Sequence, residues 1–127
     1  MKKIVLDIQS GIHAHNMERM LMQELESYQV VVSESPDSTA EWCKTHKADV
    51  LLMEIKAYSP WMLEERLEIC KAVRRQSPEC RIVLSVDENS DPALAERVKQ
   101  CKKDGIIDAF IYNSTSEKYL AALLDSV

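Results

Sequence analysis

The chain has 127 residues and a formal net charge of −5. This length fits one domain, residues 1–127, which buries enough surface to fold without a disulfide or a structural metal. The negative charge repels nucleic acid, so we expect no direct nucleic-acid binding by this domain. No apolar stretch approaches the roughly 18 residues of a membrane span, and the first apolar segment is too short for a signal-peptide core. We therefore expect a cytoplasmic protein without a membrane contact.

Apolar segments alternate with helical patterns from one end of the chain to the other. Runs typical of short strands occupy residues 4–6, 28–32, 50–55, 82–86 and 107–111. Apolar residues at helical spacing lie between and after them: Met17, Met20, Leu21, Leu25 and Tyr28, then Leu63, Leu67 and Cys70, then Leu94, Val98 and Cys101, and last Leu120, Leu123, Leu124 and Val127. A weaker helix follows Ser38. The alternation predicts βαβ units around a parallel sheet.

Helix start and stop signals agree with this pattern. Ser38 and Ser114 each begin a capping box, in which a hydroxyl and a glutamate three residues later satisfy free amides. Asp91 precedes a proline, as expected of an N-cap, and Gly105 stands where the fourth helix should end. We predict an α/β fold with five parallel strands in the order 2-1-3-4-5 and helices on both faces.

That strand order brings the ends of strands one, three, four and five to one crevice, where ligands of open α/β sheets bind. The residues at these ends are Asp7, Ile8, Glu54, Ser85, Tyr112 and Asn113. Glu54 is the most informative of them, because it ends the apolar run Ala48-Asp49-Val50-Leu51-Leu52-Met53-Glu54-Ile55. Such a run is typical of a central parallel strand that is buried on both faces.

The run resembles the third strand of the CheY-like receiver domains of bacterial two-component response regulators. That strand typically reads Pro-Asp-Leu-Val-Leu-Leu-Asp and ends on the aspartate that accepts a phosphoryl group. The resemblance covers essentially the whole chain and implies the flavodoxin-like (βα)5 sandwich. It also implies an acidic pair after strand one, a hydroxyl residue after strand four and a lysine after strand five.

This chain departs from the family at three of these positions. Glu54 stands at the phospho-acceptor position, and Asn113 stands at the lysine position. Asp7 matches the first acid of the acidic pocket, but Ile8 occupies the place of the second. Because Mg²⁺ needs oxygen ligands, we expect no cofactor beyond weak Mg²⁺ binding, with Asp7 and Glu54 as the weak metal candidates. The resemblance implies that restoring phosphorylation needs more than one change, and that Ile8→Asp, Glu54→Asp and Asn113→Lys together should restore it.

Two positions of the family's switch are retained. Ser85 matches the hydroxyl residue after strand four, and Phe110 matches the movable aromatic residue on strand five. If Glu54 mimics a permanently charged acceptor, its carboxylate should accept a hydrogen bond from Ser85, and Phe110 should point inward. We therefore interpret the chain as an atypical receiver, or pseudo-receiver, that acts in signal transduction through protein–protein interaction and is not an enzyme.

The resemblance assigns partner docking to the face formed by helix four, strand five and helix five, where a homodimer or an output domain would bind. The chain is then a stand-alone regulator or the amino-terminal part of a longer transcriptional regulator. Two alternatives stay open. One is a phosphorylatable receiver with Glu54 as acceptor and Asp7 as metal anchor. The other is a flavodoxin-like domain that binds a small molecule between Trp61 and Tyr112.

Other reactive side chains give weaker signals. His13 and His15 lie two residues apart, whereas a zinc site needs three or four convergent ligands, so we expect solvated histidines. The four cysteines form no Cys-x-x-Cys pair, and we expect reduced, buried thiols. Basic residues on helices three and four suggest a solvated face or a docking surface for an acidic partner.

Overall fold

The structure, a computed structural model, describes residues 2–127. Its strands are β1 (Lys2–Asp7), β2 (Tyr28–Val32), β3 (Val50–Glu54), β4 (Arg81–Val86) and β5 (Ala109–Tyr112). Its helices are α1 (Gly11–Glu24), α2 (Thr39–His46), α3 (Leu63–Gln76), α4 (Pro92–Lys103) and α5 (Glu117–Ser126), with a 3-10 turn, η1 (Pro36–Ser38), before α2. Within residues 2–127, no helix is both long enough and apolar enough to cross a membrane.

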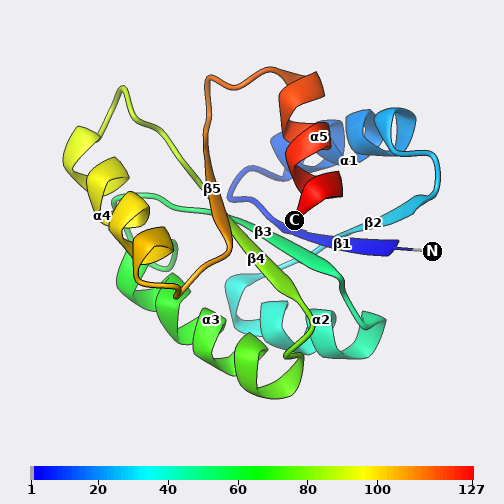
Figure 1. Cartoon of the computed structure of the whole chain (residues 1–127), viewed down its shortest axis with the longest axis horizontal. Helices are drawn as coiled ribbons and strands as arrows, with labels where there is room; N and C mark the ends of the chain where they lie inside the picture. Colours follow the sequence, from blue (N-terminus) through cyan, green and yellow to red (C-terminus); the bar gives the residue numbers. More distant parts are fainter. Residues whose placement is uncertain (1) are drawn as a thin grey trace.

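The five strands form one parallel sheet in the order β2-β1-β3-β4-β5 (Figure 1), which confirms the predicted fold class. Strand β3 lies at the centre, between β1 and β4. The register pairs Asp7 with Met53 and Glu54 with Ser85, so the carboxyl ends of these strands finish at one edge of the sheet. The parallel topology therefore brings together the strand-end residues predicted from the sequence.

Helices cover both faces of the sheet, with α1 and α5 on one side and α2, α3 and α4 on the other (Figure 1). Successive residues of β3 alternate between the two resulting cores: Leu51 and Met53 pack toward α3 and α4, and Val50 and Leu52 pack toward α1 and α5. Every residue of β3 is buried. This double burial explains why the strand reads as an unbroken apolar run instead of alternating with polar residues.

Some element boundaries differ from the prediction. The fifth strand covers Ala109–Tyr112, not residues 107–111, because the Asp108 side chain takes the place of strand pairing there. Its carboxylate accepts a hydrogen bond from the Ile82 backbone amide at 2.8 Å and pairs with Arg74 and Arg81. Strand β2 begins at Tyr28, as predicted, although Tyr28 also falls at helical spacing after Leu25, and α1 already ends at Glu24. Helical periodicity alone could not detect this helix end, because α1 stops without a glycine or proline signal.

The helix caps were only partly predicted. Asp91 caps α4 by accepting from the Leu94 amide at 3.0 Å, and Gly105 has a φ of 77°, as the αL position after a helix requires. Ser38 precedes α2, but its side chain makes no capping bond, because the preceding 3-10 turn directs its hydroxyl to the Ser35 carbonyl. The cap of α5 is Ser116, not Ser114, and it accepts from the Tyr119 amide.

All four cysteines are free and buried, as the sequence predicts. Burial raises the pKa of the Cys70 thiol to about 12. Burial and a 2.5 Å hydrogen bond to the Asp125 carboxylate raise the pKa of Tyr28 to about 12 as well. Both groups stay protonated in the folded state at a pH where the unfolded chain already ionises, at roughly pH 8.5 for Cys and 10 for Tyr.

This difference predicts alkaline destabilisation. Stability contributed by the Cys70 thiol is fully present below pH about 8.5 and is lost as the pH rises toward its folded-state value. We expect the free energy of unfolding, measured by urea titration, to fall above pH about 8.5 by up to ~1.4 kcal/mol per pH unit for each such thiol. Cys70→Val should reduce this slope. An unfolding free energy that is the same at pH 8 and pH 10.5 would contradict the prediction.

Candidate functional site

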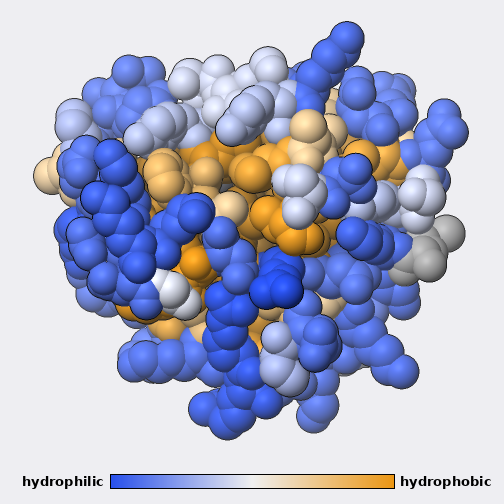
Figure 2. Space-filling model, viewed as in Figure 1, coloured by the Kyte–Doolittle hydropathy of each residue, from blue (hydrophilic) through white to orange (hydrophobic). Residues whose placement is uncertain are grey.

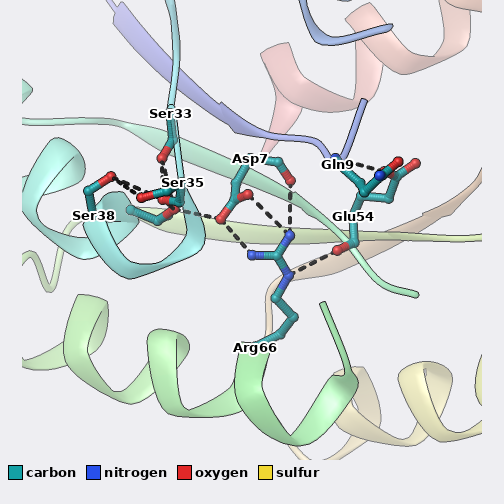
Figure 3. Close-up of polar contacts among 8 residues, drawn as sticks. Asp7, Gln9, Ser33, Ser35, Ser38, Glu54 and Arg66 are labelled. Atoms are coloured by element: carbon teal, nitrogen blue, oxygen red, sulfur yellow. Dashed lines mark hydrogen bonds and ion pairs between the residues drawn. The ribbon is translucent and has the colours of Figure 1, made fainter. Parts of the chain in front are cut away.

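The carboxyl ends of β1, β3, β4 and β5 surround one crevice. Ile8, Glu54, Ser85 and Asn113 all line a cavity of about 620 Å³ at this edge of the sheet. Their positions follow from the topology, because each residue ends or directly follows a parallel strand. Asp7 ends β1 but does not line the cavity, and its carboxylate lies on the α3 side of the sheet, as Figure 3 shows.

Asp7 is bound by Arg66, a residue of α3 that the sequence analysis did not single out. Arg66 Nη1 donates to Asp7 Oδ2 at 2.6 Å and Nη2 donates to Oδ1 at 3.1 Å (Figure 3). The pair is buried, with the Arg66 side chain 0% and the Asp7 side chain 3% exposed. This is a two-pronged guanidinium–carboxylate pair, the geometry in which arginine binds carboxylates most strongly.

A third donor completes the surroundings of the Asp7 carboxylate. The Thr39 hydroxyl donates to Asp7 Oδ2 at 2.5 Å, and Ser33 Oγ lies 3.0 Å from Thr39 Oγ1. Both hydroxyl residues are buried. Asp7 Oδ2 therefore carries two donors and Oδ1 carries one, which leaves little capacity for a metal ion. The adjacent Ile8 side chain offers no oxygen ligand, so these residues do not fit a Mg²⁺ ion.

Arg66 also ties the two strand ends together. Its Nε donates to the Glu54 carbonyl at 2.9 Å, and Nη2 lies 3.3 Å from the Asp7 carbonyl oxygen. One side chain thus fixes the end of β1, the end of β3 and the start of α3. The sequence held a signal for this role: Arg66 follows Leu63 by three residues and precedes Cys70 by four, so it falls on the core-facing stripe of α3. A charged residue on such a stripe needs a buried partner.

Glu54 has a different environment from Asp7. Its Oε1 accepts from the Gln9 backbone amide at 3.0 Å (Figure 3), and its Oε2 lies 3.5 Å from Lys56 Nζ. The cation of the crevice is therefore Lys56, which follows β3, and not a residue after β5. The role of Lys56 was not predicted from the sequence, because the resemblance places the lysine after strand five, where Asn113 stands.

Ser85 does not make the expected hydrogen bond. Its hydroxyl donates to Asn113 Oδ1 at 2.6 Å instead of to Glu54. The amide of Asn113 thus draws Ser85 toward β5, while Gln9 and Lys56 hold the Glu54 carboxylate on the other side. The prediction of a hydrogen bond from Ser85 to Glu54 is therefore wrong for this structure.

The aromatic residues of the crevice are only partly where we expected them. Phe110 is half-buried against the core on the α4 side, and its ring meets Tyr112 edge-on at 5.6 Å. Tyr112 lines the cavity, but Trp61 does not. Trp61 instead packs edge-on against Tyr58 in the loop after β3, with the two ring centres 5.9 Å apart.

The histidines lie near the crevice without forming a metal site. His13 lines the cavity from the first turn of α1, and His15 Nδ1 lies 3.2 Å from Glu18 Oε1 on the exposed side of that helix. Within residues 2–127, no three His, Cys, Asp or Glu side chains are grouped to hold a metal ion.

No protein-family model matches this sequence, and no curated protein matches it significantly. Solved structures do resemble the fold. A response regulator receiver domain protein from Clostridium thermocellum aligns with a TM-score of 0.79 at 11% identity, covering 98% of this chain and 92% of its own. An orphan response regulator of H. pylori aligns with a TM-score of 0.74 at 15% identity over 98% and 94% of the two chains.

A third similar structure belongs to a family of redox sensors in the streptococci that evolved from two-component response regulators. It aligns with a TM-score of 0.77 at 17% identity, covering 99% of this chain and 50% of its own. These identities establish the fold and not the activity. Together with the parallel 2-1-3-4-5 sheet, they show that the chain has the fold of the CheY-like receiver domains of response regulators.

Proposed function

We propose that the chain is a receiver-like signalling module that does not accept a phosphoryl group and acts by binding a protein partner. The observation that carries this proposal is the buried Arg66–Asp7 pair. A receiver needs the first acid of its pocket to hold Mg²⁺, which neutralises the charge that gathers at the acceptor. Here a guanidinium occupies both oxygens of that acid, and its positive charge disfavours a second cation nearby.

The remaining positions support the same conclusion. Ile8 supplies no ligand to a metal ion, and Asn113 supplies no cation to a phosphoryl group, because its side chain is a neutral amide. The oxygen of that amide also accepts a hydrogen bond from Ser85. Glu54 is already paired with Lys56 and the Gln9 amide. Glu54, Ser85 and Asn113 therefore all have partners within the crevice, which favours one fixed conformation over a change of conformation driven by phosphorylation.

The surface around β5 supports partner binding. Strand β5 is an edge strand, and Figure 2 shows hydrophobic surface in the middle of the face between α4 and α5, surrounded by hydrophilic side chains. Partly or fully exposed large hydrophobic residues of β5 and α5, and of the position directly after α5, are Phe110, Tyr112, Tyr119, Leu123 and Val127. An apolar area with a polar rim is the usual composition of a protein–protein interface. A second copy of this chain or an output domain would bind this α4-β5-α5 face.

Sedimentation velocity at rising protein concentration tests this proposal. We expect weak self-association that Mg²⁺ with a small-molecule phosphodonor does not change, and that Tyr112→Glu or Tyr119→Glu weakens at least tenfold. Tyr58→Glu is the matched control, because Tyr58 is also exposed but lies in the loop after β3. The proposal is contradicted if the phosphodonor induces association, or if Tyr58→Glu weakens association as much as the two changes near β5.

A further inference from the structure

We propose that the cavity of about 620 Å³ at the crevice binds a small organic ammonium compound with an apolar body. The cavity lies above the ends of β1, β3, β4 and β5 and extends between α1 and α5. Its volume falls within the roughly 300–1,000 Å³ of small-molecule sites. It also lies between the ends of β1 and β3, where the connection after β1 leads to one side of the sheet and the connection after β3 leads to the other, and α/β sheets bind ligands at such points.

The inner part of the cavity is apolar. Leu52, Ile111 and Leu120 line it from β3, β5 and α5, and all three are buried in the core on the α1 and α5 side. Met17 and Met20 line it from α1 and are only partly buried. Methionine side chains are flexible and polarizable, so this wall can adapt to an aliphatic or aromatic body. The inner part offers no charged group to a ligand.

The outer part of the cavity carries an excess of negative charge. Among the residues described by the structure, Glu54 and Glu117 line it, and Lys56 is the one lysine or arginine that does so. Lys56 is paired with Glu54, and Glu117 forms no ion pair within residues 2–127. An ammonium group would restore charge balance here, while a carboxylate or phosphate would meet the uncompensated carboxylate of Glu117.

The polar groups around the opening are held in place before any ligand arrives. The Gln9 amide fixes one oxygen of Glu54, and Ser85 is bound to Asn113. A site that is ordered in advance loses less entropy on binding. This inference goes beyond the proposed signalling role, which needs no occupant. Ligand binding is tested by NMR titration and the signalling role by sedimentation, so a negative result for one proposal leaves the other standing.

Three probes with the same six-carbon chain separate the contributions: hexylammonium, hexanol and hexanoate. We would titrate each into protein labelled at the methionine methyl groups and follow the NMR spectrum. Hexylammonium should shift the Met17 and Met20 methyl signals in a saturable way, with a dissociation constant in roughly the millimolar range for so small a probe. Hexanoate should bind at least tenfold more weakly, with hexanol between them. Met22, which is exposed and outside the cavity, should not shift.

Two variants complete the test. Met20→Trp should narrow the cavity and weaken the shift of the remaining Met17 signal, whereas Met22→Trp on the same helix should leave the Met17 and Met20 shifts unchanged. Glu117→Gln changes an exposed side chain and keeps the fold, so it should weaken hexylammonium binding at least threefold and leave hexanol binding unchanged. The proposal is overturned if no saturable shift occurs, if hexanoate binds as tightly as hexylammonium, or if Glu117→Gln weakens both probes equally.

Discussion

Replacing Arg66 with methionine is expected to lower the free energy of unfolding by about 3 to 5 kcal/mol. The change removes both guanidinium bonds to the Asp7 carboxylate and leaves that carboxylate buried with Thr39 as its one remaining side-chain donor. It also removes the link from Nε to the Glu54 carbonyl. Urea unfolding followed by circular dichroism measures the loss.

Two companion variants show whether the buried pair is the cause. Arg75→Met changes an exposed arginine on the same helix, so its effect should stay within about 0.5 kcal/mol. Asp7→Leu combined with Arg66→Met removes both charges and should recover most of the stability, because an apolar replacement leaves no unpaired charge. If Arg66→Met costs less than about 1 kcal/mol, the pair does not hold the strand ends together as argued here.

The second large effect concerns restoring phosphorylation. From the sequence, the combination of Ile8→Asp, Glu54→Asp and Asn113→Lys was expected to be sufficient. The structure adds a fourth requirement, because Arg66 still occupies the Asp7 carboxylate in that triple variant. We expect the triple variant to remain unlabelled and the quadruple variant with Arg66→Met to gain Mg²⁺-dependent labelling by a small-molecule phosphodonor.

Mass spectrometry of the intact protein compares these variants, with circular dichroism as the check on folding. The expected change is from no detectable labelling in the triple variant to labelling of most molecules in the quadruple variant. Without the guanidinium, the Asp7 carboxylate would be free to turn toward the aspartates at positions 8 and 54, which together would supply oxygen ligands for the ion. Stoichiometric labelling of the triple variant would show that Arg66 does not block the pocket. It would contradict the proposal that the Arg66–Asp7 pair prevents phosphorylation.

The sheet was predictable because its signals are local. The apolar run that ends on Glu54 marks a strand covered on both faces, and the alternation of strands and helices allows few topologies. Boundaries were missed where a tertiary contact decides them. Asp108 is bound to arginines and lies before β5, and the 3-10 turn before α2 takes the Ser38 hydroxyl away from its capping role.

The candidate site was predicted in position but not in its bonds. Glu54, Ser85 and Asn113 do meet at one edge of the sheet, because parallel strand ends must. Their partners depend on side chains from other elements, which spacing does not reveal. Arg66 lies 59 residues from Asp7, and the local sequence around either residue does not predict that the two pair. Ser85 had two acceptors within the predicted crevice, and the structure pairs it with Asn113.

The most direct test of the account is whether the unmodified domain takes up a phosphoryl group. The purified chain would be incubated with Mg²⁺ and a small-molecule phosphodonor and its intact mass measured, with hydroxylamine treatment to detect an acyl phosphate. Because Arg66 holds Asp7 and Ile8 offers no ligand, we predict no gain in mass and no hydroxylamine-sensitive adduct. A stoichiometric gain of one phosphoryl group, located on Glu54, would contradict the account.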